Sequence, residues 1–268
     1  MAKPMMHVPR RRFGQHFLHD RNVIAKIIAA IDPRRGDHLV EIGPGQGALT
    51  EPLLTKLDLL HVIEIDRDLI ESLRARFDPA TLTIHAGDAL EFDFGRLPQP
   101  LRVVGNLPYN ISTPLLFHLA RFSERILDGH FMLQREVVDR MVARPSTPDY
   151  GRLSVTLQAR FEMARLFVVG SGAFTPAPKV ESAIVRMRPL AIPLVAGAIE
   201  PVFQSVVTRA FTKRRKTLRN ALAGVADPAL LETLGIDPGL RPEALSVHEF
   251  ARIAAALLKR QEPAVPPA

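Results

Sequence analysis

Short apolar runs alternate with helical patterns along the first half of the chain, and this alternation constrains the fold more than any other feature. Strands that alternate with helices form a parallel sheet with helices on both faces. The predicted strands are His38–Ile42, Leu59–Ile65, Leu82–His85, Arg102–Gly105 and Gly129–Leu133, with Met163–Val169 and Ser182–Pro189 as antiparallel edge strands. The predicted helices are Asn22–Ile31 (N-cap Asp20), Ala48–Leu57, Asp68–Phe77, Thr113–Phe122 and Val137–Ala143.

The composition changes near Pro189–Pro193, and from Pro201 the pattern is helical with few strand signals. Ser246 and Glu249 form a capping box, which predicts a helix that runs to about Lys259. We therefore predict four parts, namely a flexible basic tail (1–12), an α/β domain (13–189), a helical domain (190–262) and a disordered Pro/Ala-rich tail (263–268).

The positive charge is concentrated outside the α/β domain. The net charge of +7 comes from 35 bases and 28 acids. Residues 1–12 hold four bases and no acid, residues 13–189 hold 21 of each, and residues 190–268 hold 10 bases and seven acids. Basic appendages on a neutral domain favour a polyanionic partner, although a basic surface can also serve solubility alone.

Several classes of protein are disfavoured by what the sequence lacks. Without cysteine there are no disulfides and no thiolate metal sites, which fits a reducing cytoplasm. The basic N-terminus is not followed by the apolar region of a signal peptide. No apolar run approaches the ~20 residues that span a bilayer. We expect a cytoplasmic protein with no membrane partner.

A glycine-rich turn, Gly43–Gly47, stands between a predicted strand and a predicted helix. Such a turn lets the backbone approach a ligand closely, but nicotinamide enzymes and ligand-free tight turns share it. Glu64 ends the next strand, 21 residues after Gly43, where an acid binds ribose hydroxyls. Asp88 follows the third strand and is placed to accept from an adenine amine. Either acid alone could be a helix cap or a solvated loop residue; together with the glycines they indicate an adenosine-bearing cofactor.

Asn106 and Tyr109 follow the fourth strand, separated by Leu107 and Pro108. An amide oxygen accepts from an exocyclic amine, and an aromatic ring offers a face on which a base can stack. This pair suits an amine that attacks a sulfonium methyl group, whereas hydride transfer has no use for it. Alone, the tetrapeptide would be an ordinary Asn-x-Pro turn.

The ordered set of motifs resembles the ribosomal RNA adenine dimethyltransferase family, in particular its bacterial small-subunit members. The resemblance spans about residues 13–255. The segments that carry it are Phe13–Leu18 with Asp20, Glu41–Thr50, Glu64–Asp66, Gly87–Ala89, Asn106–Thr113, Met132–Val137, Tyr150–Val155, Phe174–Ser182 and Arg214–Asn220.

The resemblance implies a class I, Rossmann-like, S-adenosylmethionine-dependent methyltransferase sheet with a small all-α C-terminal domain. It implies transfer of four methyl groups, two to each of two adjacent adenosines near the 3′ end of 16S rRNA, in the small subunit or its precursor. Neither a metal nor a covalent intermediate is needed, and we expect a monomer. The implied cofactor-binding residues are His16 and Leu18 on the methionine side, Gly43, Glu64, Asp88 and Asn106, and the implied catalytic residues are Asn106, Tyr109 and Phe174.

The chain departs from the family pattern at three positions. His16 stands where Asn is usual, and we expect cofactor binding to survive with some added response to pH. Ala177 replaces a common Pro, and Glu181 replaces a common Asp.

A helix over Val202–Leu222 is predicted to carry a basic face. Six bases and no acid lie between Arg209 and Arg219. We predict that Arg209, Lys213 and Lys216, at helical spacing, contact RNA phosphates together with Arg10, Arg11 and Arg12. The alternative is a solvated helix face.

Four other functions remain open at this point. A large-subunit RNA adenine methyltransferase would share the cofactor motifs, and a nicotinamide oxidoreductase would share the glycine turn. A DNA adenine methyltransferase is disfavoured by the motif order. A ribosome-assembly factor, for which methylation is a timing signal, would bind immature subunits even without catalysis.

Overall fold

The computed structural model describes residues 15–261, which fall into two compact units. The sheet unit runs up to Val138 and includes Met163–Pro189; the helical unit comprises Asp139–Glu162 and the chain from Leu190. The change at residues 189 and 190 lies where the sequence placed it. Residues 139–162 were predicted to belong to the α/β domain. They belong to the helical unit instead, because Tyr150 and Val155 pack in its core. The predicted tails lie outside the described residues.

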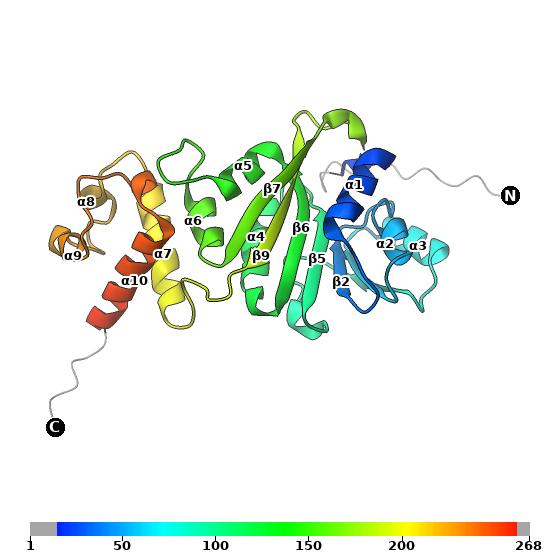
Figure 1. The fold of residues 1–268 in the computed structure, drawn as a ribbon, viewed down its shortest axis with the longest axis horizontal. Helices are drawn as coiled ribbons and strands as arrows, with labels where there is room; N and C mark the ends of the chain where they lie inside the picture. The colour runs from blue at the N-terminus through cyan, green and yellow to red at the C-terminus, as the bar shows by residue number, and fades with distance from the viewer. Residues whose placement is uncertain (1–14, 262–268) are drawn as a thin grey trace, which may run out of the picture. The chain divides into compact units, whose positions relative to one another are not determined.

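The sheet has seven strands in the order β4-β3-β2-β5-β6-β9-β7, and Figure 1 shows β2, β5, β6, β9 and β7 side by side. The first five pair in parallel, and β9 runs antiparallel to β6. Every predicted strand is therefore present; β7 is the outermost and β9 lies inside it. The bounds are β2 His38–Ile42, β3 Leu60–Glu64, β4 Leu82–Ala86, β5 Leu101–Asn106, β6 Ile126–Gln134, β7 Phe161–Val169 and β9 Ser182–Pro189.

Two helices of the sheet unit, α1 and α3, begin after an aspartate that accepts hydrogen bonds from their first amides. Asp20 accepts hydrogen bonds from the amides of Asn22 and Val23, as predicted. The helix predicted over Ala48–Leu57 is shorter, and it begins only at Thr50, after a turn in which Gly43, Gly45 and Gly47 have positive φ. The bounds are α1 Arg21–Ile31, α2 Thr50–Leu54, α3 Arg67–Arg76, α4 Ser112–Ala120 and α5 Arg135–Val142, the last crossing into the helical unit; short 3-10 helices are Phe94–Arg96, Ser123–Arg125, Ser171–Ala173 and Pro242–Ala244.

A second, two-stranded sheet was not predicted. It pairs β1 (Phe17–Leu18) with β8 (Phe174–Thr175), so that Leu18 lies opposite Phe174. Two residues carry no periodicity, so the sequence pattern could not reveal either strand. This pairing brings the segment before α1 beside a segment that follows β7.

The helical unit has its own apolar core. Phe203, Val206, Val207 and Ala210 of α7 and Phe250 of α10 are all fully buried in it. The capping box is confirmed, since the Ser246 amide donates to Glu249 Oε2 at 2.7 Å. The bounds are α6 Arg152–Gln158, α7 Ile199–Thr212, α8 Leu218–Ala221, α9 Pro228–Thr233 and α10 Val247–Gln261.

The predicted single helix over 202–222 is wrong, because α7 ends at Thr212 and α8 begins at Leu218. The Leu218 amide donates to the Leu240 carbonyl at 2.7 Å, and the Arg219 amide donates to the Pro238 carbonyl at 3.0 Å. These tertiary hydrogen bonds replace the helical ones. Arg209, Lys213 and Lys216 therefore do not share one helical face.

Among residues 15–261, no helix has both the length and the apolar character that a membrane span requires.

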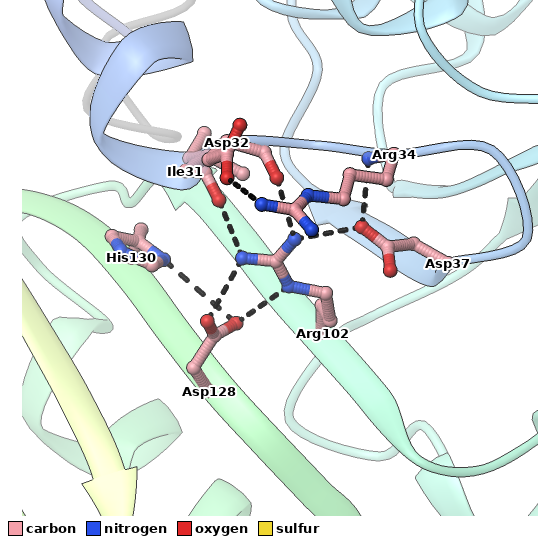
Figure 2. A network of polar contacts seen from close by, with 7 residues as sticks. All are labelled: Ile31, Asp32, Arg34, Asp37, Arg102, Asp128 and His130. Carbon is pink, nitrogen blue, oxygen red and sulfur yellow. Dashed lines mark hydrogen bonds and ion pairs between the residues drawn. The ribbon is translucent and has the colours of Figure 1, made fainter.

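Arg102 joins three elements of the sheet unit near the amino end of β5 (Figure 2). Its guanidinium binds both oxygens of Asp128 on β6 at 2.9 Å and Asp37 Oδ2 at 2.7 Å. It also donates to the carbonyls of Ile31 at 2.5 Å and Asp32 at 3.1 Å, at the C-terminal end of α1. These acceptors compensate for the burial of a charge that is only 8% exposed.

His130 lies next to this network, 3.9 Å from Asp128 Oδ1, and both of its ring nitrogens lack hydrogen-bond partners among the described residues. Burial lowers the pKa of His130 to about 4, partly offset by Asp128. The imidazole is therefore neutral at pH 7, so the charged partner of Asp128 is Arg102 and not His130.

Arg102→Met is expected to destabilise the protein by about 3–5 kcal/mol, because it leaves two carboxylates without their cation. The control is Arg34→Met, whose ion pair with Asp32 is 77% and 68% exposed. That variant should cost less than about 1 kcal/mol. Urea unfolding measures both, and equal losses would show that the buried network contributes no more than a surface pair.

Candidate active site

A cavity in the sheet unit lies at the carboxyl ends of β2, β3 and β5, where ligands bind in open α/β sheets. Seven of the eight predicted catalytic and cofactor-binding residues line it. These are His16, Leu18, Gly43, Glu64, Asp88, Asn106 and Tyr109.

The floor of the cavity is the glycine turn. Gly43, Gly45 and Gly47 have φ values of +66°, +56° and +83°, which side chains with a Cβ rarely adopt. A Cβ on Gly45 would also lie 3.2 Å from the Phe17 ring. Gly43 and Gly45 thus present backbone, without a side chain, to the cavity.

Glu64 is 6% exposed and is held by backbone amides. Oε1 accepts from Ile65 and Asp66, both at 2.9 Å, and Oε2 accepts from Gly45 at 3.3 Å. Burial raises the pKa of Glu64, while these hydrogen bonds lower it. Oε2 keeps acceptor capacity for ligand hydroxyl groups.

Asp88 follows β4 and lines the same cavity. Its Oδ1 accepts from the Leu90 amide at 2.9 Å. Its Oδ2 has no hydrogen-bond partner in the part of the chain that the structure describes, so it can accept from a ligand amine.

Asn106 is the last residue of β5, and its amide has a defined orientation. Its Nδ2 donates to the His16 carbonyl oxygen at 3.0 Å. A carbonyl only accepts, so this contact must involve the nitrogen, and the amide oxygen Oδ1 is left without a partner among residues 15–261, as a free acceptor.

Tyr109 packs against His16, with ring centroids 5.6 Å apart and an interplanar angle of 29°. His16 Nδ1 lies 2.7 Å from the Pro176 carbonyl oxygen. Phe174, the third predicted catalytic residue, is not brought to the cavity. It is 3% exposed and packs in the core of the sheet unit, because β8 pairs with β1.

Two further residues of the cavity were missed. Ile65 is 46% exposed, which is high for a large apolar side chain, and it lines the cavity next to Glu64. Gln15 also lines it, and its Nε2 donates to Asp66 Oδ2 at 3.0 Å. Both lie in motif segments that the sequence analysis quoted, so adjacency to Glu64 and His16 was the available signal.

The basic residues of the helical unit gather around a separate hollow. It is lined by Phe211, Thr212, Lys213, Arg214, Arg215, Lys216 and Asn220. The turn after α7 brings Lys213 and Lys216 together, since the Lys216 amide donates to the Lys213 carbonyl at 2.8 Å. Arg209 is not part of this hollow; its guanidinium donates to the Ala223 carbonyl. Arg10, Arg11 and Arg12 lie outside the described residues.

The sequence matches the family model described as ribosomal RNA adenine dimethylase over residues 6–259. The chain belongs to this family. Proteins named ribosomal RNA small subunit methyltransferase A from Chromobacterium violaceum and Aromatoleum aromaticum are 58% and 61% identical to it. The alignments cover 92% of this chain in both cases, and 95% and 93% of the relatives.

Two solved structures support the same family. A dimethyladenosine transferase from Plasmodium falciparum superposes with a TM-score of 0.77 at 25% identity, covering 89% of this chain and 96% of that one. The 23S rRNA methyltransferase ErmE superposes with a TM-score of 0.69 at 28% identity, covering 90% and 99%. The predicted class I methyltransferase fold is confirmed.

The cavity of this family member fits its methyl donor, S-adenosylmethionine. The glycine turn leaves room for a ligand against the backbone, and Glu64 Oε2 and Asp88 Oδ2 keep acceptor capacity for the hydroxyl and amine donors of a nucleoside. Ile65 adds an apolar surface suited to a flat ring. Which residue contacts which part of the cofactor stays a prediction.

A second buried acid, Glu41, lines this cavity and is 2% exposed. The Thr50 hydroxyl donates to its Oε2 at 2.6 Å. Burial raises the pKa of Glu41 from 4.5 to about 7, with the Thr50 hydrogen bond lowering it and Glu64 raising it. The folded protein thus binds more protons than the unfolded chain between these values, and stability falls as pH rises through them.

Glu41→Gln is expected to remove this loss, because an amide stays neutral and can still accept from Thr50. Without cofactor, the difference in the free energy of unfolding between the variant and the wild type should shift in favour of the variant by roughly 2–3 kcal/mol between pH 5 and pH 8. Urea unfolding at both pH values measures the gain. Glu71→Gln, on the exposed side of α3, should show none, and equal behaviour of the two variants would contradict the account.

Proposed function

We propose that this enzyme transfers methyl groups from S-adenosylmethionine to the N6 amines of two adjacent adenosines near the 3′ end of 16S rRNA, giving N6,N6-dimethyladenosine. The observation that carries the chemistry is the free Oδ1 of Asn106, a residue that lines the same cavity as Tyr109, Glu64 and Asp88. The choice of the small subunit is supported by relatives of that name that are 55–61% identical.

Asn106 would act on the amine itself. The lone pair of an adenine amine is delocalised into the ring, which makes it a poor nucleophile. A hydrogen bond from this amine to Oδ1, with a second to a neighbouring backbone carbonyl, favours a tetrahedral nitrogen and frees the pair. S-adenosylmethionine, when bound, supplies an electrophilic methyl group. Positioning of the amine then accounts for much of the rate.

Tyr109 would hold the target base. A base that is stacked within an RNA duplex cannot reach the cavity, so it must be flipped out or unpaired. Stacking on an aromatic face holds such a base whatever its sequence context. Phe174 would need to leave the core to stack as well, so Tyr109 is the stronger candidate.

The basic hollow after α7 would bind phosphate groups of the rRNA backbone. Lys213, Arg215 and Lys216 are exposed and have no salt-bridge partner within the described residues, unlike Arg214, which lies 3.5 Å from Glu243. Free cations near one another suit phosphate groups. With Arg10, Arg11 and Arg12, they would bind the small subunit or its precursor. We further propose that the enzyme acts as a monomer in the cytoplasm.

The first experiment uses small ribosomal subunits that lack adenine dimethylation, incubated with purified enzyme and radiolabelled S-adenosylmethionine. Dimethyladenosine confined to the small subunit is the expected product. Asn106→Ala should lower the rate by at least about 100-fold. The control is Asn22→Ala, an exposed residue of α1, which should keep wild-type activity.

Large-subunit RNA and DNA are assayed in parallel. Label on large-subunit RNA would contradict the proposed target while leaving the family chemistry intact. If Asn106→Ala still binds immature subunits, a role in assembly beyond catalysis is supported; loss of that binding would exclude a pure scaffold.

The second experiment tests the basic hollow. Lys213→Glu/Lys216→Glu is expected to weaken binding to small-subunit RNA and to make the plot of log K against log salt shallower by about 1–2. Binding of S-adenosylmethionine should not change. Lys56→Glu/Lys259→Glu reverses the same charge at exposed positions outside the hollow. If both double variants weakened RNA binding equally, the loss would follow from net charge, and the proposal that the hollow binds RNA would be wrong.

A further inference from the structure

Among the described residues, the phenol hydroxyl of Tyr109 has one hydrogen-bond partner. This hydroxyl lies 2.6 Å from Ser182 Oγ, at the short end for an O–H···O hydrogen bond. Ser182 is fully buried. Burial raises the pKa of Tyr109, with the Ser182 hydrogen bond lowering it, so the phenol stays protonated at neutral pH.

Ser182 lies in a part of the sheet that is held by strand pairing and by contacts of the preceding residue. It is the first residue of β9 and pairs with Gln134 at the end of β6. The residue before it, Glu181, accepts from the Arg135 amide at 2.9 Å and pairs with the Arg135 guanidinium at 2.7 Å. Tyr109, in contrast, lies in the loop between β5 and α4. The contact therefore joins a loop side chain to the sheet.

The ring of Tyr109 is also held at its face. His16 packs against it, and His16 Nδ1 donates to the Pro176 carbonyl, because a carbonyl oxygen can only accept. Pro176 directly follows β8, and Ser182 is the first residue of β9, so both lie on the segment that connects these strands. One segment thus fixes the tyrosine at its edge directly and at its face through His16.

We infer that Ser182 is a positioning residue for methyl transfer, which orients the Tyr109 ring so that a target adenine stacks in register with Asn106. The inference rests on the proposed function. Without the hydrogen bond, the ring can turn about its two side-chain torsions, and small errors in alignment of reacting groups are costly in rate. Ser182 itself does not line the cavity.

The kinetic test is a double-mutant cycle of Ser182→Ala and Tyr109→Phe, assayed on undermethylated small subunits. Each single variant is expected to lower kcat about tenfold, with an unchanged Kd for S-adenosylmethionine. Because both remove the same hydrogen bond, the double variant should lose no more than either single one. Ser182→Thr keeps a hydroxyl and should recover activity relative to Ser182→Ala. Losses that multiply in the double variant would overturn the inference.

The spectroscopic test follows the ring directly. The chain has no tryptophan and two tyrosines, Tyr109 and Tyr150. Tyr150 is buried in the helical unit, and its hydroxyl has no hydrogen-bond partner in the described structure, so Tyr150→Phe should be tolerated. In that background, Ser182→Ala is expected to increase the fast depolarisation of Tyr109 fluorescence, and Ser182→Thr is not.

The two tests separate this inference from the proposed function. If Ser182→Ala leaves both kcat and Tyr109 depolarisation at wild-type values, the inference is overturned while the proposed function stands. If the wild-type enzyme fails to methylate small subunits, the proposed function fails. In that case the depolarisation experiment still decides whether Ser182 orients the ring, and the claim that this serves methyl transfer falls.

Discussion

Parallel pairing of β2 with both β3 and β5 is the constraint on which the active site depends. Ile42 pairs with Ile63 on one side and Glu41 with Val104 on the other, so the strands end nearly level. β4 continues the register, with Glu64 opposite Ala86. The glycine turn, two acids and an amide that are separated along the chain therefore meet at one edge. Side chains that would each be ordinary alone together form a site for an adenosine-bearing donor.

β5 is attached at both ends to the segment that contains α1. At its amino end, Arg102 donates to the last carbonyls of α1 and to acids on either side (Figure 2). At its carboxyl end, the Asn106 amide donates to the His16 carbonyl. The same strand thus carries the candidate catalytic amide and holds the cavity wall formed by His16 and Leu18. The second attachment also sets the amide orientation, which leaves the oxygen for an amine.

The helical unit shows how tertiary hydrogen bonds override a local pattern. The apolar spacing from Phe203 to Leu222 suits one long helix, and its large buried side chains do pack in one core. Yet the carbonyls of Pro238 and Leu240 accept from the chain after Lys216, and the helix ends. The basic residues consequently surround a hollow formed by a turn, where their mutual repulsion is relieved by solvent and, we propose, by phosphate.

The sequence by itself determined the seven strands of the large sheet, the glycine turn and the Asp20 and Ser246 caps, because each depends on periodicity or on residues within one element. It also determined the family, because the order of the motifs along the chain is a property of the sequence. The tertiary structure alone decided the β1–β8 pairing, the burial of Phe174 and the transfer of residues 139–162 to the helical unit. It also decided the contacts of Tyr109 with Ser182, 73 positions away, and of His16 with Pro176, 160 positions away. No local pattern encodes such contacts, since they arise only when distant segments pack together.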